Sequence, residues 1–245
     1  MIDLHCHILP GVDDGAFRME DAIEMAWMAS DSGVTTIVAT PHCNLPNSEQ
    51  KNYISSELKY HFYRLQRRIK QEKIPLTILP GSEVMCTPDV PKLIRSGNLL
   101  TLAGSDYLLV EFFFDEESHY MDEMLSAIKA EGLIPVIAHP ERYEAIQENP
   151  AIVERWFRND YVIQLNKGSI LGNLGRQAAF AADWILSQGL AHVVASDAHS
   201  PTVRTTNMTE LREYLTGLCS SGYTEVLLDI NPNRIINNLP ILQAE

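Results

Sequence analysis

The sequence of 245 residues is 45% hydrophobic and carries a formal net charge of −13 at pH 7. This length and hydrophobic content predict one large globular core, and the acidic balance disfavours nucleic acid or anionic lipid as a partner. No apolar run approaches the roughly 20 residues that span a bilayer. The start does not resemble a signal peptide, and the cysteines show no C-x-x-C pairing, so we expect a cytoplasmic protein with reduced thiols and no membrane insertion.

Short β-branched or apolar runs alternate with stretches of helical periodicity along the chain. The expected strands cover residues 2–7, 35–42, 76–83, 107–113, 134–140, 161–166 and 192–199. Between them, apolar residues three and four positions apart predict amphipathic helices over residues 53–72, 120–130 and around 211–218. Gly33, Gly132 and Gly189 follow helical stretches at positions typical of a C-capping glycine.

The alternation of strands and helices predicts an α/β fold with parallel strands. No low-complexity linker interrupts it, so we expect a single domain over residues 1–245. No strand is followed by a G-x-G-x-x-G or G-x-x-x-x-G-K-S/T phosphate loop, which is typical of nucleotide-binding open sheets. A barrel is therefore favoured over a doubly wound sheet.

Imidazoles and carboxylates recur at the C-terminal ends of the expected strands. His5 and His7 lie one residue apart, so they point to the same face of a strand, and Asp197 and His199 repeat this spacing. A single such residue is more often a turn former or a helix cap. In a parallel barrel, however, all these ends meet at one rim, so their repetition predicts a metal site there. The residues in this placement are His5, His7, Asp13, Asp14, His42, Glu83, Glu111, His139, Asp197 and His199.

The donor types narrow the choice of metal. A mixture of nitrogen and oxygen donors without a thiolate favours Mn, Zn or Fe over Mg or Ca. The set is larger than one ion can use, so we expect a cluster with at least one bridging carboxylate. An anionic substrate would also need concentrated positive charge in this acidic protein, and metal ions supply it.

The motifs HxH, VDDG, TPH, GSE, VEF, AHPERY and SDAH occur in this order along the chain. This ordered set resembles the polymerase and histidinol phosphatase (PHP) superfamily. Within it, PDV, VIAHPERY and NPNRI resemble the bacterial manganese-dependent tyrosine-protein phosphatases of capsule and exopolysaccharide loci. The resemblance covers almost the whole chain. It implies a distorted (β/α)7 TIM-like barrel and three divalent metal ions, with Mn²⁺ expected and Fe, Zn or Mg as alternatives.

The resemblance also implies how the ligands are divided. Asp14 is expected to be a ligand, and Asp13 is the alternative because the sequence does not show which of the two points inward. By position, the first ion takes His5, His7, Glu83 and Asp197, the second takes Glu83 as a bridge with Glu111 and His139, and the third takes Asp14, His42 and His199.

The implied activity is hydrolysis of phosphotyrosine on a bacterial tyrosine autokinase that regulates capsular or exopolysaccharide synthesis. A hydroxide bridging the first two ions would attack phosphorus, since coordination lowers the pKa of water from 15.7 to about 7. Arg142 and Arg204 are placed to bind the phosphate, with exposed surface arginine as the alternative for each. Asp197 or a metal-bound water would protonate the leaving group.

Other chemistries fit the sequence less well. No cysteine begins a C-x5-R motif and no G-x-S-x-G elbow occurs, which argues against thiol-dependent phosphatases and serine hydrolases. A small-molecule phosphatase such as histidinol phosphatase is the alternative within the superfamily. The loop over residues 43–52 is neutral, whereas a basic loop is expected of the family. The sequence therefore does not decide the identity of the substrate. A module without metals and a nuclease are disfavoured by the complete ligand set and the acidic charge.

Three histidines fall outside the proposed ligand set. His192 begins its strand, at the rim opposite the site, so we expect a structural role. His61 lies in an amphipathic helix and His119 in an acidic loop, and we expect both to contact solvent.

Overall fold

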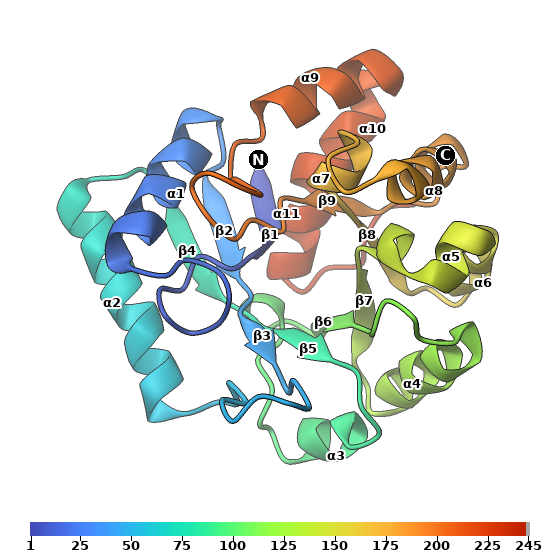
Figure 1. The fold of residues 1–245 in the computed structure, drawn as a ribbon, viewed down its shortest axis with the longest axis horizontal. Helices are drawn as coiled ribbons and strands as arrows, with labels where there is room; N and C mark the ends of the chain where they lie inside the picture. Colours follow the sequence, from blue (N-terminus) through green and yellow to red (C-terminus); the bar gives the residue numbers. More distant parts are fainter. Residues whose placement is uncertain (244–245) are drawn as a thin grey trace.

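Parallel strands form the centre of the molecule and helices surround them as an outer layer (Figure 1). The structure is a computed structural model and describes residues 1–243. This arrangement confirms the expected α/β class. The strands are β1 (Ile2–Cys6), β2 (Thr36–Ala39), β3 (His42–Cys43), β4 (Thr77–Pro80), β5 (Glu83–Met85), β6 (Tyr107–Glu111), β7 (Ile134–Ala138), β8 (Val162–Asn166) and β9 (Val193–Ala195).

The helices include the three that the periodicity predicts. The first of these begins at Ser56 because the Ser55 side chain caps it, accepting the amide of Leu58 at 3.0 Å. No helix within residues 1–243 is long and apolar enough to cross a membrane. The α-helices are α1 (Met19–Asp31), α2 (Ser56–Glu72), α3 (Val90–Arg95), α4 (Ser118–Ala130), α5 (Glu144–Glu148), α6 (Ile152–Arg158), α7 (Lys167–Ile170), α8 (Arg176–Ser187), α9 (Thr209–Leu218), α10 (Ser221–Glu225) and α11 (Asn231–Ile236).

The strands form two parallel sheets, where the sequence predicts one barrel. Their orders are β1-β2-β4 and β3-β5-β6-β7-β8-β9. Each of two expected strands is split: residues 35–42 give β2 and β3, and residues 76–83 give β4 and the start of β5. Pro41 lies at the first break, where its missing amide hydrogen interrupts the ladder. The prediction of parallel β/α units is therefore confirmed, whereas the described residues form no single closed sheet.

The two sheets also meet between β1 and the segment that follows β9. The amide of His7 donates to the carbonyl of Ala198 at 2.9 Å, and the amide of Asp197 donates to the carbonyl of His5 at 2.8 Å. These hydrogen bonds fix the last strand end against the first. They therefore bring together two segments that are almost 200 residues apart in sequence.

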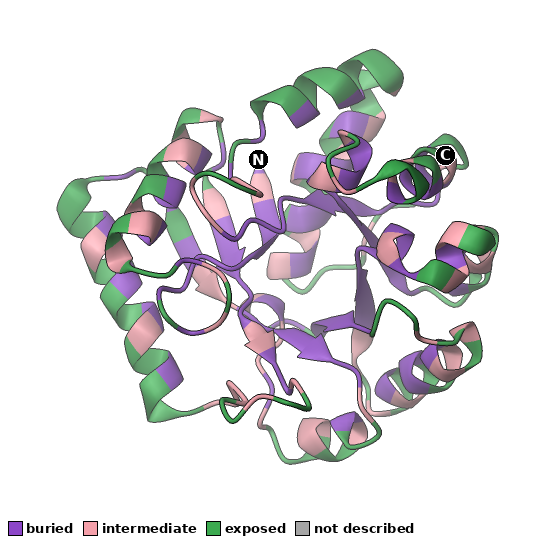
Figure 2. Ribbon diagram, viewed as in Figure 1, coloured by how far each residue is buried: buried purple, intermediate pink, exposed green. Residues whose placement is uncertain are grey.

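Burial follows the layered arrangement. Buried residues occupy the strands and the inward faces of the helices, whereas the outward helix faces are exposed (Figure 2). On α2, for example, Leu58, Phe62, Leu65 and Ile69 are all buried, which confirms the predicted apolar face. The strands are thus held from both sides, which gives their C-terminal ends a rigid support.

His192, immediately before β9, is a buried structural histidine, as the sequence predicts. The amide of Ile163 donates to His192 Nδ1 at 3.0 Å, and the imidazole stacks on Phe157 with ring centroids 5.0 Å apart. Burial lowers the pKa of His192 from 6.5 to about 4. The folded protein therefore favours the neutral ring.

We expect His192 to make stability depend on pH. Its folded pKa lies below the unfolded value, so its contribution is complete above pH 6.5 and is lost as the pH falls toward 4. Replacing His192 by Asn keeps an acceptor and removes the titration. Between about pH 7.5 and pH 5, urea unfolding should show the wild type losing about 2 kcal/mol more than His192→Asn. His119→Asn, at an 82% exposed side chain, is the control and should match the wild type; equal losses in all three proteins would contradict the prediction.

Candidate metal centre

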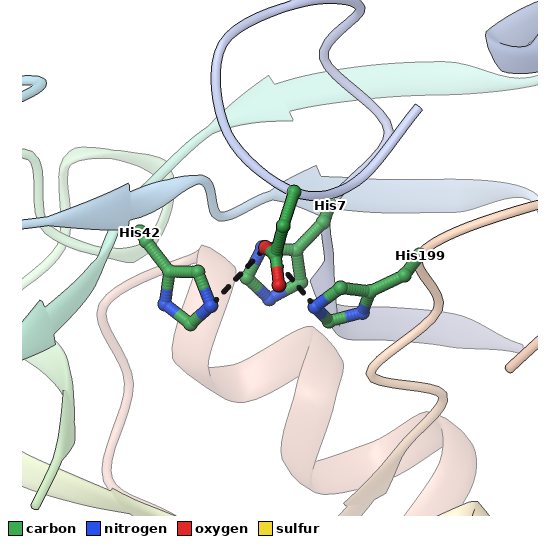
Figure 3. Close-up of side chains that lie close together, drawn as sticks. His7, His42 and His199 are labelled. Atoms are coloured by element: carbon green, nitrogen blue, oxygen red, sulfur yellow. Dashed lines mark ion pairs between the residues drawn. The ribbon is translucent and has the colours of Figure 1, made fainter. Parts of the chain in front are cut away.

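Histidine side chains from separate strands converge at one end of the sheets. His5 and His7 point to the same side, with their Nε2 atoms 3.2 Å apart. The ring centroid of His7 lies 4.5 Å from that of His42 and 3.9 Å from that of His199. Figure 3 shows these last three rings arranged around a common point. The period-two alternation of a strand and the convergence of parallel strand ends produce this arrangement.

Glu83, at the start of β5, is the central carboxylate of the cluster. Its Oε2 atom lies 3.1 Å from His5 Nε2, from His7 Nε2 and from His42 Nδ1. Its Oε1 atom lies 2.9 Å from His139 Nε2. A carboxylate with imidazole nitrogens from several strands near both of its oxygens has the placement that a bridging ligand requires.

The two adjacent aspartates have different surroundings. Asp13 Oδ2 accepts the Nδ1 proton of His7 at 2.7 Å and the amide of His42 at 2.9 Å. Asp14 Oδ1 instead lies 3.4 Å from His42 Nε2 and 3.5 Å from His199 Nε2. The structure thus groups Asp14 with the imidazoles, whereas Asp13 orients His7 and leaves its Nε2 atom facing the cluster.

Every residue that the resemblance implies as a ligand lies in at least one compact donor group. Three groupings differ from the implied division. His42 Nδ1 lies 2.8 Å from Glu111 Oε1, His139 groups with His5 and Asp197, and His7 also groups with the residues assigned to the third ion. The division among three ions stays a prediction. The groups whose donor atoms lie within 4.8 Å of one another are His7–Asp14–His42–His199, His5–His7–Glu83, His5–His139–Asp197 and His42–Glu83–Glu111.

The buried polar atoms of the cluster fit divalent cations. Glu83 Oε2, Glu111 Oε1 and His42 Nδ1 are buried without a hydrogen-bond partner in residues 1–243. An uncompensated buried charge costs several kcal/mol, so such atoms need a cation close by. Their mixed nitrogen and oxygen chemistry suits Mn, Fe or Zn.

The pKa shifts follow from the same crowding of charge. Burial acts to lower the pKa of His42, but the carboxylates of Glu83 and Glu111 outweigh it and raise that pKa to about 11. Burial acts to raise the pKa of Glu83, and the imidazoles of His5 and His42 hold it well below its usual range. Positive charge is therefore favoured at these positions, and binding of a cation would displace the imidazole protons.

Both predicted phosphate-binding arginines lie at one carboxylate of the cluster. Arg142 Nη1 is 3.4 Å from Asp197 Oδ2, and Arg204 Nη2 donates to the same oxygen. Asn166 Nδ2 donates to it at 2.5 Å. The arginine side chains are only 20% and 27% exposed, so neither is a freely solvated surface residue.

The charges around Asp197 favour its carboxylate form. Burial acts to raise its pKa, but His5 and His7 hold that pKa well below the usual value of an aspartate. This form suits a ligand and the acceptor that positions the arginines. The role of Asp197 as general acid stays a prediction.

Three residues of the segments that carry the site have strained backbone conformations. His139, Asp197 and Arg204 have φ values of 36°, 48° and 52°, in the left-handed region that non-glycine residues rarely adopt. Each such residue costs about 1–3 kcal/mol. Local hydrogen bonds hold these turns, as when the His199 amide donates to the Arg204 carbonyl at 2.9 Å.

Residues that the sequence did not predict support the ligands. Gln164 Oε1 accepts the Nδ1 proton of His5 at 2.9 Å, which leaves His5 Nε2 free for a cation, and Asn166 contacts Asp197 as described above. Both lie on β8, and their signal was the polar alternation in the otherwise apolar run YVIQLN. Asp3, buried on β1, accepts the amide of Ser196 at 3.0 Å and so holds the segment that leads to Asp197.

Comparison with known proteins identifies the family of this chain. The model for capsular polysaccharide synthesis proteins, CpsB/CapC, matches residues 1–237. The chain belongs to the CpsB/CapC family. Tyrosine-protein phosphatase YwqE of Bacillus subtilis is 39% identical over 204 residues, covering 83% of this chain and 79% of the relative. Tyrosine-protein phosphatase CpsB of Streptococcus pneumoniae is 29% identical over 241 residues, covering 96% and 98%.

Solved structures agree with this assignment. A chain from crystal structures of YwqE and CpsB, described as metal-dependent tyrosine phosphatases, superposes with a TM-score of 0.92 at 36% identity and covers 100% of this chain and 97% of that one. The resemblance to tyrosine-protein phosphatases of capsule loci is therefore confirmed. Dihydropyrimidinase from Brevibacillus agri has a TM-score of 0.57 at 10% identity, covering 100% of this chain and 73% of that one, and shares the fold alone.

We expect Gly15→Ala to disrupt the centre through His7. A Cβ atom at Gly15 would stand 2.1 Å from the carbonyl oxygen of His7, so the histidine or the loop must move. The variant should lose bound divalent metal and phosphatase activity together, with a stability loss of about 1–3 kcal/mol. The matched control is Gly217→Ala on α9, where nothing described lies within 4 Å of the added Cβ. Metal content per chain and activity are the measurements; unchanged metal content in Gly15→Ala would contradict the prediction.

Proposed function

We propose that this protein is a metal-dependent protein-tyrosine phosphatase that acts on a phosphotyrosine-containing protein, a bacterial tyrosine autokinase, in capsular or exopolysaccharide synthesis. Membership of the CpsB/CapC family supports the activity and the pathway. The observation that carries the proposal is the meeting of two arginines with the donor cluster at Asp197. Guanidinium groups beside a cation site suit a phosphate monoester, because both bind its oxygens.

The proposal includes three divalent metal ions, Mn²⁺ with Fe, Zn or Mg as alternatives. When bound, such ions lower the pKa of a coordinated water and neutralise charge on the phosphate. We assign residues 1–245 to one PHP-type phosphatase domain, and the two sheets to a distorted (β/α)7 TIM-like barrel. The hydrogen bonds between the ends of β1 and β9 support that assignment. The proposed ligands are His5, His7, Asp14, His42, Glu83, Glu111, His139, Asp197 and His199.

The chain's own residues bind and orient the phosphate. Arg142 and Arg204 each present guanidinium hydrogens near Asp197, and Asn166 holds that carboxylate in place. The phosphate would accept hydrogen bonds from both arginines while its other oxygens face the donor cluster. A phenolate leaving group has a conjugate acid with pKa near 10, so it needs less help from a general acid than an alkoxide does.

We expect Arg142→Ala to separate substrate binding from metal binding. The variant loses one phosphate contact but none of the proposed ligands, so kcat/KM should fall by about 10²–10³-fold. Manganese content should equal that of the wild type. Arg155→Ala, on the exposed face of α6, is a control that should leave turnover unchanged. Loss of metal from Arg142→Ala would show that its main role is to hold Asp197.

We expect the manganese-loaded protein to prefer phosphotyrosine. Turnover should be compared on a phosphotyrosine peptide, the matched phosphoserine peptide and histidinol phosphate. Chelator should abolish hydrolysis and added manganese should restore it, because the buried carboxylates need cations for the active arrangement. Equal or faster turnover of histidinol phosphate would refute the proposal that the substrate is a protein, and would favour a small-molecule phosphatase. Full activity after complete metal removal would overturn the mechanism.

A further inference from the structure

Phe114 is a large apolar side chain that remains exposed beside the metal centre. It follows β6, and 45% of its surface is accessible to solvent. Its carbonyl oxygen accepts the amide of Glu144 at 2.8 Å, which fixes the backbone of this segment against α5. The guanidinium carbon of Arg142 lies 4.4 Å from the centroid of its ring, and the ring of His139 lies 6.2 Å away. Phe114 thus lies beside Arg142 and His139, next to the place where the proposed function puts the phosphate.

We propose that Phe114 is a specificity-determining residue that packs against the phenyl ring of phosphotyrosine. This inference rests on the proposed function. In an aryl phosphate the ring is joined to phosphorus through one oxygen, so it lies within a few ångströms of any group that binds the phosphate. Arg142 lies 4.4 Å from the Phe114 centroid, so an aryl group on a phosphate held by Arg142 has a nearby ring to pair with, at the 4.5–7 Å centroid separation that aromatic pairs prefer. A phosphoserine side chain offers only a methylene group there.

Phe17 is the competing aromatic side chain. It is 80% exposed and borders a cavity of about 510 Å³ together with Asp14 and His42. Within the described chain, however, no cation–π contact joins Phe17 to either of the two arginines at Asp197. Phe114 has such a contact with Arg142. The position of the phosphate-binding group therefore favours Phe114 as the wall of the phenyl subsite.

A purely structural role for Phe114 makes a different prediction. The ring also packs near Tyr143, with centroids 6.4 Å apart, and supports Arg142 from one side. If Phe114 only supported Arg142, its removal would weaken every phosphate ligand equally. A phenyl subsite instead weakens aryl ligands selectively. The ratio of aryl to alkyl affinity separates the two roles because both ligands use the same phosphate-binding groups.

The test uses phenylphosphonate and methylphosphonate as non-hydrolysable competitors of the manganese-loaded enzyme. Phe114→Ala should lower the preference for phenylphosphonate over methylphosphonate about tenfold. Phe114→Tyr should keep that preference within about twofold, since it retains the ring. Phe180→Ala, at a 65% exposed position on α8, is the control and should leave both inhibition constants unchanged. Phe114→Leu keeps most of the apolar volume but lacks the ring. If Phe114→Ala does not fold, the same ratio of inhibition constants is measured on Phe114→Leu.

An unchanged preference in Phe114→Ala or Phe114→Leu would overturn the inference. So would a tenfold loss in Phe17→Ala together with no loss in the Phe114 variants, since the ring would then lie on the other side of the centre. The inference and the proposed function fail separately. A wild type that cleaves histidinol phosphate but not the phosphotyrosine peptide refutes the proposed function, whereas a phosphotyrosine-specific wild type with Phe114-independent phosphonate binding refutes only the role of Phe114.

Discussion

The burial of carboxylates at the C-terminal ends of the strands is the constraint on which the structure depends. Glu83 and Asp197 are almost completely buried, and Glu111 lies beside them at 6% exposure. Negative charges that lie close together repel strongly in a low-dielectric interior. The fold therefore needs positive charge beside these carboxylates. The surrounding imidazoles supply positive charge when they are protonated. A divalent cation supplies two positive charges in a smaller volume. The acidic net charge of the chain makes this local concentration of positive charge more important for an anionic substrate.

The scaffold keeps these groups close by means that cost stability. His139 and Asp197 adopt left-handed backbone conformations, and Gly15 approaches His7 so closely that no larger residue fits without movement. Packing of the helices around the strands and the hydrogen bonds between the β1 and β9 ends offset that strain. Functional sites often contain unfavourable backbone conformations, because the chemistry requires side chains to point in particular directions.

Much of the site could be predicted because it obeys local rules. The one-residue spacing of His5 and His7 fixes their common direction, and strand-end position determines which residues meet. The break between β2 and β3 was not predicted, because residues 35–42 form one continuous β-branched or apolar run in the sequence. Whether Pro41 divides this run depends on the strands that pair with β2 and with β3, which belong to different sheets. The proposal of Asp14 rather than Asp13 as a ligand likewise rests on a contact between Asp13 and His7 that the sequence does not show. Support from Gln164 was missed because it reaches across the fold to His5.

Asp197 links the two halves of the proposed chemistry. Its Oδ1 atom lies 3.4 Å from His5 Nε2 and 3.5 Å from His7 Nε2. Its Oδ2 atom accepts hydrogen bonds from Arg142 and Arg204. Neutralising either side changes the charge that the other side experiences, so binding of cations and binding of phosphate are energetically coupled through one carboxylate. A cation held at the oxygen that faces His5 and His7 would weaken the attraction of the carboxylate for both guanidinium groups, and so would favour the binding of phosphate. The coupling is reciprocal, so bound phosphate would favour the cation by the same factor.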